Sequence, residues 1–216
     1  MKISEQAFGT IPLSPPYPKI EKDLPDDPLE LFNEWFNLAK NCDEIEEANA
    51  MNLATLGEDG FPKSRVVLLK EIDNGSLIFY TNYNSEKARS IDLHAQVSIN
   101  FFWPALEKQV IVKSRATKVS REKSADYFNS RPRGSRIGAW VSHQSSAINS
   151  REALDEQLME IENKFKDQEV PLPDFWGGFA CEPVSFEFWQ GRENRLHDRI
   201  LFERVNGSWI TKRLQP

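Results

Sequence analysis

Cysteine and histidine are scarce in this chain of 216 residues, which has two cysteines and three histidines. Cys42 and Cys181 are far apart and form neither a CxxC pair nor a metal-ligand cluster, a pattern typical of a reducing compartment. Long apolar runs are also missing, since no stretch approaches the roughly 20 residues that cross a bilayer. The first residues lack the basic start and apolar run of a secretory signal. These absences predict a cytoplasmic protein with no bound metal and no membrane partner.

Several common catalytic signatures are absent as well. The sequence has no HExxH pair, no Walker loop, no GxGxxG segment and no signal of a Ser-His-Asp triad. A net charge of −6 argues against a nucleic-acid partner, although a local basic patch can still hold a small phosphorylated ligand. Aromatic residues are plentiful, with fourteen Phe and six Trp; most fit a core, and some could line a pocket for a flat ligand.

Prolines divide the chain into two parts. Five of them fall in residues 1–25, which have no clear periodicity, so we expect an extended N-terminal arm there. Residues 26–216 are expected to form a single domain, long enough to bury a core. Asp27 and Pro28 predict the start of a helix, because Asp is a good N-cap and Pro is favoured at the first helical position.

From Ala50 onward the pattern is mostly that of strands separated by glycine-containing turns. We expect strands over Ala50–Leu56, Ser64–Glu71, Ser76–Thr81, Gln96–Trp103, Lys108–Lys118, Gly177–Trp189, Asp198–Glu203 and Ser208–Arg213. Helices are expected over Glu86–Leu93, from Ser120 through Phe128 and from about Ser150 to Lys166. Strands in meander order with inserted helices predict an α+β fold built on a mainly antiparallel barrel with peripheral helices.

Two basic stretches stand out in the first half. Arg65 and Lys70 bound an apolar strand, and strand alternation would point them to opposite faces. A ligand lying along the strand end could still touch both; otherwise they are two solvated strand ends. Lys87 lies in the first turn of the expected helix after Ser85, where free amides and the helix dipole favour a phosphate. Surface helices often begin in this way, so the second signal is weak alone.

Two further stretches offer polar groups beside apolar ones. The segment that begins at Tyr127 and ends at Ser135 supplies a phenol, two guanidinium groups and hydroxyls around a Pro-Gly turn, a set that suits a phosphate. The alternative is a basic surface loop. Gln144 and Ser145 follow an apolar run and could contact the edge of a heteroaromatic ring.

Arg195, His197 and Arg199 alternate near the C-terminus, so a regular strand would present all three on one face. Two guanidinium groups around an imidazole suit an anionic or phosphorylated ligand. The alternative is an ordinary exposed strand face.

In this order and spacing, the stretches resemble the pyridoxine/pyridoxamine 5′-phosphate oxidase family over about residues 24 to 216. Arg65–Lys70, Ser130–Arg133, Phe175–Phe179 and Arg195–Arg199 carry much of the resemblance. The resemblance implies an FMN-binding split β-barrel. It also implies a homodimer with two FMN sites at the interface, each built from both subunits.

The resemblance also implies roles for individual residues. FMN would contact Arg65, Val66, Val67, Leu68, Leu69, Lys70, Tyr80, Thr81, Lys87, Gln109, Gln144, Ser145, Trp189 and Arg199. The phosphate of a B6 vitamer would bind Lys70, Tyr127, Arg131 and Ser135, while Arg195 and His197 would face its pyridine ring and form the catalytic pair. The implied reaction passes a hydride from the 4′ carbon to FMN, and O2 then reoxidises the flavin and gives hydrogen peroxide.

Three positions depart from the family pattern. The arm around Tyr17 lacks the Arg-x-x-Tyr signature, Glu86 stands where the phosphate helix usually has Arg, and Arg192 and Asn194 fill variable turn positions. The arm and the C-terminal end also resemble the flavin oxidases of phenazine biosynthesis, which act on dihydrophenazine acids. Lys70 and the 130–135 loop favour the vitamin B6 enzyme. A carrier or sensor that binds flavin without catalysis is a third reading.

Overall fold

The computed structural model describes residues 24–216, so nearly all of the expected N-terminal arm lies outside the described residues. The helices are α1 (Pro28–Lys40), α2 (Glu86–Leu93), α3 (Arg121–Ser130), α4 (Arg133–Val141) and α5 (Arg151–Lys164), with short 3-10 turns η2 (Pro104–Leu106) and η3 (Glu193–Arg195). The strands are β1 (Ala50–Leu56), β2 (Pro62–Leu68), β3 (Glu71–Asp73), β4 (Ser76–Asn82), β5 (Gln96–Trp103), β6 (Lys108–Lys118), β7 (Trp176–Gln190), β8 (Asp198–Val205) and β9 (Ser208–Leu214). Among the described residues, no helix is long and apolar enough to cross a membrane.

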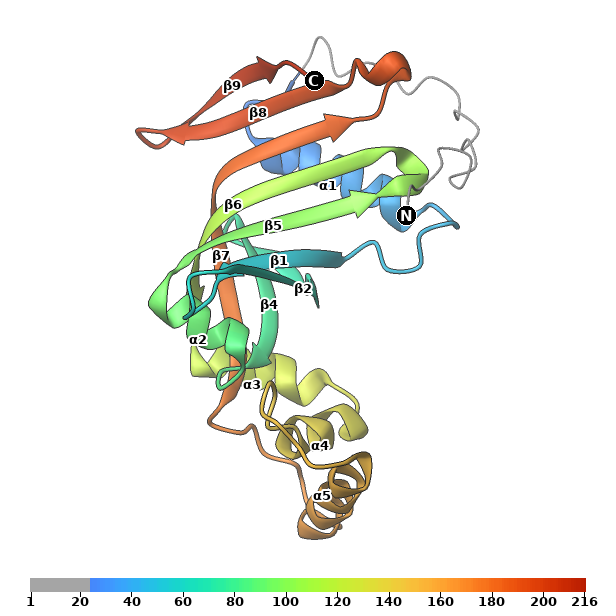
Figure 1. Cartoon of the computed structure of the whole chain (residues 1–216), viewed down its shortest axis with the longest axis vertical. Coiled ribbons are helices and arrows are strands. Elements are labelled where there is room, and N and C mark those ends of the chain that lie inside the picture. The colour runs from blue at the N-terminus through green and yellow to red at the C-terminus, as the bar shows by residue number, and fades with distance from the viewer. Residues whose placement is uncertain (1–23) are drawn as a thin grey trace.

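The strands form one curled sheet in which every pairing is antiparallel (Figure 1). Its order is β2-β1-β5-β6-β7-β4-β3, with β8 and β9 joined to β7. Strand β7 changes partner along its length: residues 176–181 pair with β4, and residues 185–190 pair with β8. Pro183 lies between the two halves, opposite a register shift in β6. The sheet therefore splits at this point, and the expected α+β class with a mainly antiparallel barrel-like sheet is confirmed.

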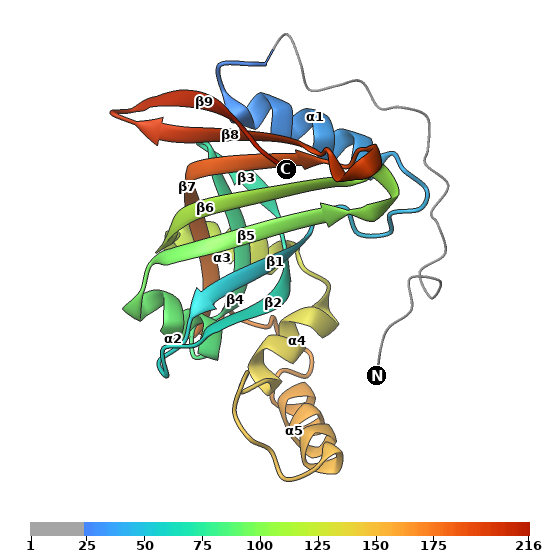
Figure 2. The ribbon, with the colours of Figure 1, turned by 45° about the horizontal axis from the view of Figure 1, so that its top comes forward.

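Helix α1 covers one side of the upper sheet, as two views agree (Figures 1 and 2). It begins where the sequence predicts, with Pro28 at its start and the Asp27 carboxylate accepting a hydrogen bond from the Leu29 amide. Phe32 is fully buried against Phe101. The helix thus closes the main core, because its apolar stripe replaces water over the sheet.

A second apolar cluster lies at the other end of the molecule, where α3, α4 and α5 follow one another (Figure 2). Phe128, Ile137 and Phe165 are buried there beside Trp176 at the start of β7. The α4 helix was not expected from the sequence, because two glycines lower its helix propensity. Pro132 immediately precedes it, so the 130–135 stretch is a helix junction and not a surface loop.

One expected strand boundary is wrong. The strand expected over Ser64–Glu71 ends at Leu68, because the chain turns from β1 toward β4: the Leu69 amide donates to Asn49 and the Lys70 amide donates to Ile78. The strand expected from Asp198 does begin there, so Arg195 and His197 precede it. The other expected bounds agree with the structure or differ from it by at most two residues.

Candidate active site

A cavity of about 790 Å³ opens between the outer end of β2, β4, the start of α2 and the α3–α4 junction. This volume is in the range of small-molecule sites. Its walls are formed by Arg65, Val66, Val67, Leu68, Lys70, Tyr80, Thr81, Asn82, Lys87, Tyr127, Arg131, Pro132, Ser135, Gly138, Ala139, Ser142, Gln144 and Trp176. The cavity therefore brings together twelve of the residues that the sequence analysis singled out.

The charge of the cavity is opposite to that of the whole chain. Arg65, Lys70, Lys87 and Arg131 line it, and no Asp or Glu of residues 24–216 does so. The chain as a whole has a net charge of −6. Four cations in a concave site, without a carboxylate in its walls, favour an anionic ligand such as a phosphate. Lys70 and Arg65 both reach the cavity because β2 ends at Leu68, between them. Beyond that end, side chains no longer have to point to alternate faces, as they would in a longer strand.

Lys87 lies deepest among these cations, with a relative exposure of 8%. Its Nζ donates to the Thr81 hydroxyl at 3.3 Å and to Gln144 Oε1 at 3.0 Å. Burial, followed by the nearby Arg65 charge, lowers the pKa of Lys87 to about 8. Within residues 24–216 no carboxylate forms an ion pair with Lys87 or Arg65, so a bound anion would stabilise both.

One wall of the cavity is aromatic. The Tyr80 and Tyr127 rings stack with centroids 4.0 Å apart, and Tyr80 also stacks on Trp176. The Arg131 guanidinium lies 4.8 Å from the Trp176 ring centroid, and its Nη1 is buried without a hydrogen-bond partner. Because a buried unpaired guanidinium nitrogen is costly, this atom is suited to a ligand oxygen. Burial, together with the Glu71 carboxylate, raises the pKa of the Tyr80 phenol, which stays protonated.

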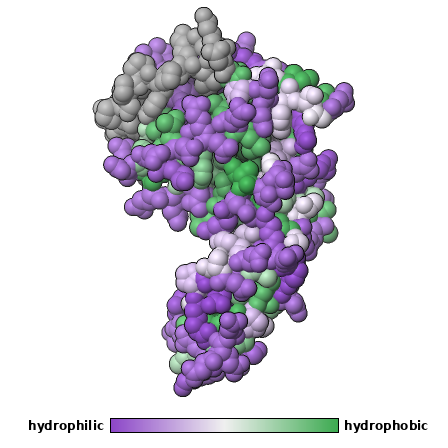
Figure 3. All heavy atoms as spheres, turned by 180° about the vertical axis from the view of Figure 1, so that it is seen from behind, coloured by the Kyte–Doolittle hydropathy of each residue, from purple (hydrophilic) through white to green (hydrophobic). Residues whose placement is uncertain are grey.

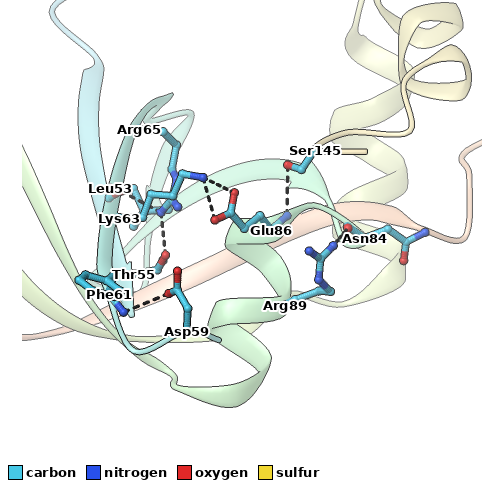
Figure 4. Close-up of polar contacts among 10 residues, drawn as sticks. All are labelled: Leu53, Thr55, Asp59, Phe61, Lys63, Arg65, Asn84, Glu86, Arg89 and Ser145. Carbon is cyan, nitrogen blue, oxygen red and sulfur yellow. Dashed lines mark hydrogen bonds and ion pairs between the residues drawn. The ribbon is translucent and has the colours of Figure 1, made fainter. Parts of the chain in front are cut away.

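The N-terminus of α2 borders the cavity (Figure 4). Ser85 occupies the cap position, but its side chain makes no capping hydrogen bond, and its hydroxyl oxygen is buried without a partner. Ser145, in the left-handed backbone region, instead accepts a hydrogen bond from the Glu86 amide at 3.2 Å. Arg65 donates to the Thr55 hydroxyl at 2.7 Å, which orients its guanidinium beside this helix end.

A second group of the expected site residues lies elsewhere in the chain. Strand register places Gln109 opposite Trp189, and Trp189 opposite Arg199, in one row across β6, β7 and β8. None of the three lines the cavity, and Trp176, which does, lies at the opposite end of β7 from Trp189. The structure therefore does not bring this row into the cavity of the same chain. Arg199 donates to Glu187 Oε1 at 2.9 and 2.7 Å.

Arg195 and His197 do not lie on a strand face, which corrects the expected alternation with Arg199. Arg195 ends the 3-10 turn η3, and both it and Asn194 have positive φ values of 60° and 56°. His197 lies between η3 and β8, with its ring 4.6 Å from the Trp189 ring centroid. Two adjacent non-glycine residues in the left-handed region make this turn strained, a feature that is common at functional sites.

The turn is held by polar contacts from both sides. The Arg192 amide donates to His197 Nδ1 at 3.1 Å, and Arg192 Nε donates to Asp198 at 2.8 Å. Arg213 donates to the other Asp198 oxygen at 2.8 Å. Although burial alone would raise it, these two guanidinium groups lower the pKa of Asp198. Because Nδ1 accepts a hydrogen bond, the imidazole proton in this arrangement is on Nε2.

Two expected flavin contacts, Leu69 and Ser145, do not line the cavity. The side chain of Leu69 lies in the main core and not in the cavity wall, and Ser145 touches only its border. Six wall residues were not among the expected contacts: Asn82, Pro132, Gly138, Ala139, Ser142 and Trp176. Trp176 lies in the Phe175–Phe179 stretch that carries part of the family resemblance, and this stretch is a signal that could have identified it.

Comparisons with known proteins agree with this geometry. Residues 38–165 match the family model of pyridoxamine 5′-phosphate oxidase, and residues 176–216 match that of the pyridoxine 5′-phosphate oxidase C-terminal dimerisation region. The chain is 55% identical over 197 residues to a pyridoxine/pyridoxamine 5′-phosphate oxidase of Christiangramia forsetii, covering 91% of this chain and 92% of the relative. It is 49% identical over 196 residues to the enzyme so named from Flavobacterium johnsoniae, covering 90% and 92%.

A solved structure with a similar fold is PhzG from Burkholderia lata in complex with tetrahydrophenazine-1-carboxylic acid. Its TM-score is 0.84 at 29% identity, with 90% of this chain and 95% of that chain covered. An FMN-binding protein from Nostoc punctiforme, related to pyridoxamine 5′-phosphate oxidase, has a TM-score of 0.69 at 15% identity, with 87% and 96% covered, and supports the fold alone. The matching family models span most of the sequence, and the chain belongs to the pyridoxamine 5′-phosphate oxidase family.

Proposed function

We propose that this protein is an oxidase that uses FMN to convert pyridoxine 5′-phosphate or pyridoxamine 5′-phosphate to pyridoxal 5′-phosphate. Bound FMN supplies the hydride acceptor, and O2 reoxidises it with release of hydrogen peroxide. The observation that carries the proposal is the cavity itself, which joins four cations to an aromatic wall and has no acidic residue in its lining. The relatives at 55% and 49% identity, which are named for this activity, support the same substrate class.

The residues of the cavity fit two phosphate groups. Lys87, Arg65 and the N-terminus of α2 form one cluster of donors, which suits the phosphate of FMN. Arg131, Tyr127 and the nearby Ser135 form another at the α3–α4 junction, which suits the phosphate of the substrate. The unpartnered Arg131 Nη1 and Ser85 hydroxyl are buried polar atoms that ligand oxygens would satisfy.

The remaining contacts are proposed to come from a second copy of the chain. Trp189, Arg195, His197 and Arg199 all fall within residues 176–216, which match a dimerisation region. None of them lines the cavity, and they lie at or beyond the end of β7 opposite Trp176, which does; we infer that they complete the site of the other subunit. Figure 3 shows apolar side chains gathered within a hydrophilic border on one face of the upper body, a pattern typical of protein interfaces.

Within the completed site each residue has a limited task. Arg195 would hold the substrate so that its 4′ carbon faces the flavin, which lowers the entropic part of the barrier. His197 would donate a hydrogen bond from Nε2, because its Nδ1 accepts from the Arg192 amide. Arg131 and Tyr127 would fix the other end of the substrate through its phosphate. We also expect the protein to act in the cytoplasm.

An oxidase of dihydrophenazine acids is the alternative function. It is supported by the TM-score of 0.84 to PhzG, but the identity to that structure is 29%, against 55% for the vitamin B6 relative. The donors at the α3–α4 junction favour the phosphorylated substrate. A dihydrophenazine acid carries no phosphate, so an enzyme for it would need a phosphate site for FMN alone.

The test is to load the purified protein with FMN and add pyridoxine 5′-phosphate under air. Pyridoxal 5′-phosphate and hydrogen peroxide should appear in equal amounts, and without air the flavin absorbance should bleach. A chain that takes up no FMN would refute the proposal. Flavin that stays oxidised with pyridoxine 5′-phosphate but bleaches with a dihydrophenazine acid would favour the alternative.

A further inference from the structure

A single carboxylate stands at the margin of the cation-lined cavity. Glu86 is the first residue of α2, directly before Lys87, and it does not line the cavity itself. Both of its carboxylate oxygens accept hydrogen bonds from Lys63 Nζ on β2, at 2.8 and 2.6 Å (Figure 4). An acidic residue in the first turn offsets the positive end of the helix dipole. A phosphate bound at this helix end would be stabilised by the same partial charge.

The neighbouring cations also respond to Glu86. Arg65 and Lys87 repel each other, since both line one cavity and neither is paired with a carboxylate within the described chain. Burial, then Arg65, lowers the pKa of Lys87, whereas Glu86 acts in the opposite direction on the pKa values of both cations. Within the described chain, Glu86 is therefore a negative charge that partly compensates both cations.

We propose that Glu86 is an internal counter-ion with which the phosphate of FMN must compete, and that Lys63 controls this competition by holding and neutralising the carboxylate. The inference rests on the proposed function, because it assumes that FMN places its phosphate beside Lys87. With Lys63 in place, the Lys63–Glu86 pair is nearly neutral, and the phosphate meets little repulsion. Without Lys63, the full negative charge of Glu86 would act on the phosphate and on the helix end.

The experiment compares Glu86→Gln, Lys63→Met and the double variant with the wild-type chain. The dissociation constant of FMN is measured by flavin fluorescence at low ionic strength, and riboflavin serves as the phosphate-free probe. Glu86→Gln should bind FMN about two- to fivefold more tightly, and Lys63→Met should bind it more weakly by a similar factor. The double variant should return close to the wild-type value. Riboflavin affinity should be the same in all four proteins.

Stability without FMN gives a second readout of opposite sign. Glu86→Gln should lower the thermal midpoint of the FMN-free protein, because Arg65 and Lys87 lose their compensating charge. Glu58→Gln is the matched control. The Glu58 carboxylate is exposed and forms an ion pair with Arg89 of α2, so the FMN affinity of this variant should equal that of the wild-type chain.

Three results would overturn the inference. One is an unchanged FMN affinity in Glu86→Gln, and another is a shift in riboflavin affinity as large as the shift for FMN. The third is weaker FMN binding in both single variants, which would indicate a purely structural ion pair. If the wild-type chain bound no FMN, the proposed function would fail together with the inference, whereas the three results above leave the proposed function intact.

Discussion

Mixing two damaged subunits tests whether each site is shared between chains. Arg131→Met removes a charged donor from the cavity and keeps an unbranched, flexible side chain. Arg195→Met removes a charged donor from the turn after β7. A charge-assisted hydrogen bond contributes about 1.5–3 kcal/mol, so each homodimer should lose roughly ten- to hundredfold in turnover. Both sites of each homodimer carry the defect.

A mixed dimer behaves differently if the two halves belong to different chains. The turn follows the end of β7 that is opposite to Trp176, a wall residue of the cavity, so the cavity of one chain would meet the turn of the other. In a two-fold mixed dimer, one site then carries both substitutions and the other carries none. Purified mixed dimers should therefore have about half of the wild-type activity, well above either parent.

The assay uses two affinity tags on co-expressed variants, so that only mixed dimers survive both purification steps. Turnover is measured with pyridoxine 5′-phosphate, and flavin absorbance gives the FMN content of each sample. Activity that stays at the level of the parents, with normal FMN content, would refute the shared site. That result would mean that the cavity and turn of one chain act together, against the separation described above.

Other predictions follow from single contacts. Phe32→Ala should lower the free energy of unfolding by about 3–5 kcal/mol in urea titrations, since the ring is fully buried. FMN affinity should fall as pH rises past about 8, because Lys87 then loses the charge that attracts the phosphate, and Lys87→Met should remove this dependence in fluorescence titrations. Asp198→Asn should lower kcat more than it changes KM, while FMN stays bound. The reason is that the substitution weakens the hydrogen bond from Arg192 that holds the turn, and an unchanged kcat would contradict this.

Much of the sheet could be predicted from the sequence because its signals are local. Asn74–Gly75 and Asn206–Gly207 have the positive φ values that tight hairpins require, and they separate strands as expected. Ser120 caps α3 by accepting a hydrogen bond from the Lys123 amide. Such turns and caps depend on a few neighbouring residues, so the sequence alone identifies them.

The errors occur where distant contacts decide the backbone. β2 ends at Leu68 because the next two amides donate hydrogen bonds outside the β1–β2 ladder. The Leu69 amide donates to the carbonyl of Asn49, before β1, and the Lys70 amide donates to that of Ile78 on β4. The helix after Pro132 forms although it contains glycines, because Ile137 and Val141 pack into the second apolar cluster. The local sequence pattern reveals neither the hydrogen bonds that end β2 nor the apolar packing that stabilises α4, because both involve residues far away in the chain.

The candidate site was predictable as a set of residue types but not as one place. Arg195, His197 and Arg199 were identified by their charge and spacing, yet the structure places the first two in a strained turn and only Arg199 on a strand. Sequence spacing assumes regular geometry, whereas the turn depends on Arg192 and Asp198. A site completed by a second copy has a further property: its two halves need no contact within one chain. Residues that share a chemical task can therefore lie apart in the fold, and the mixed-dimer assay decides whether these residues do.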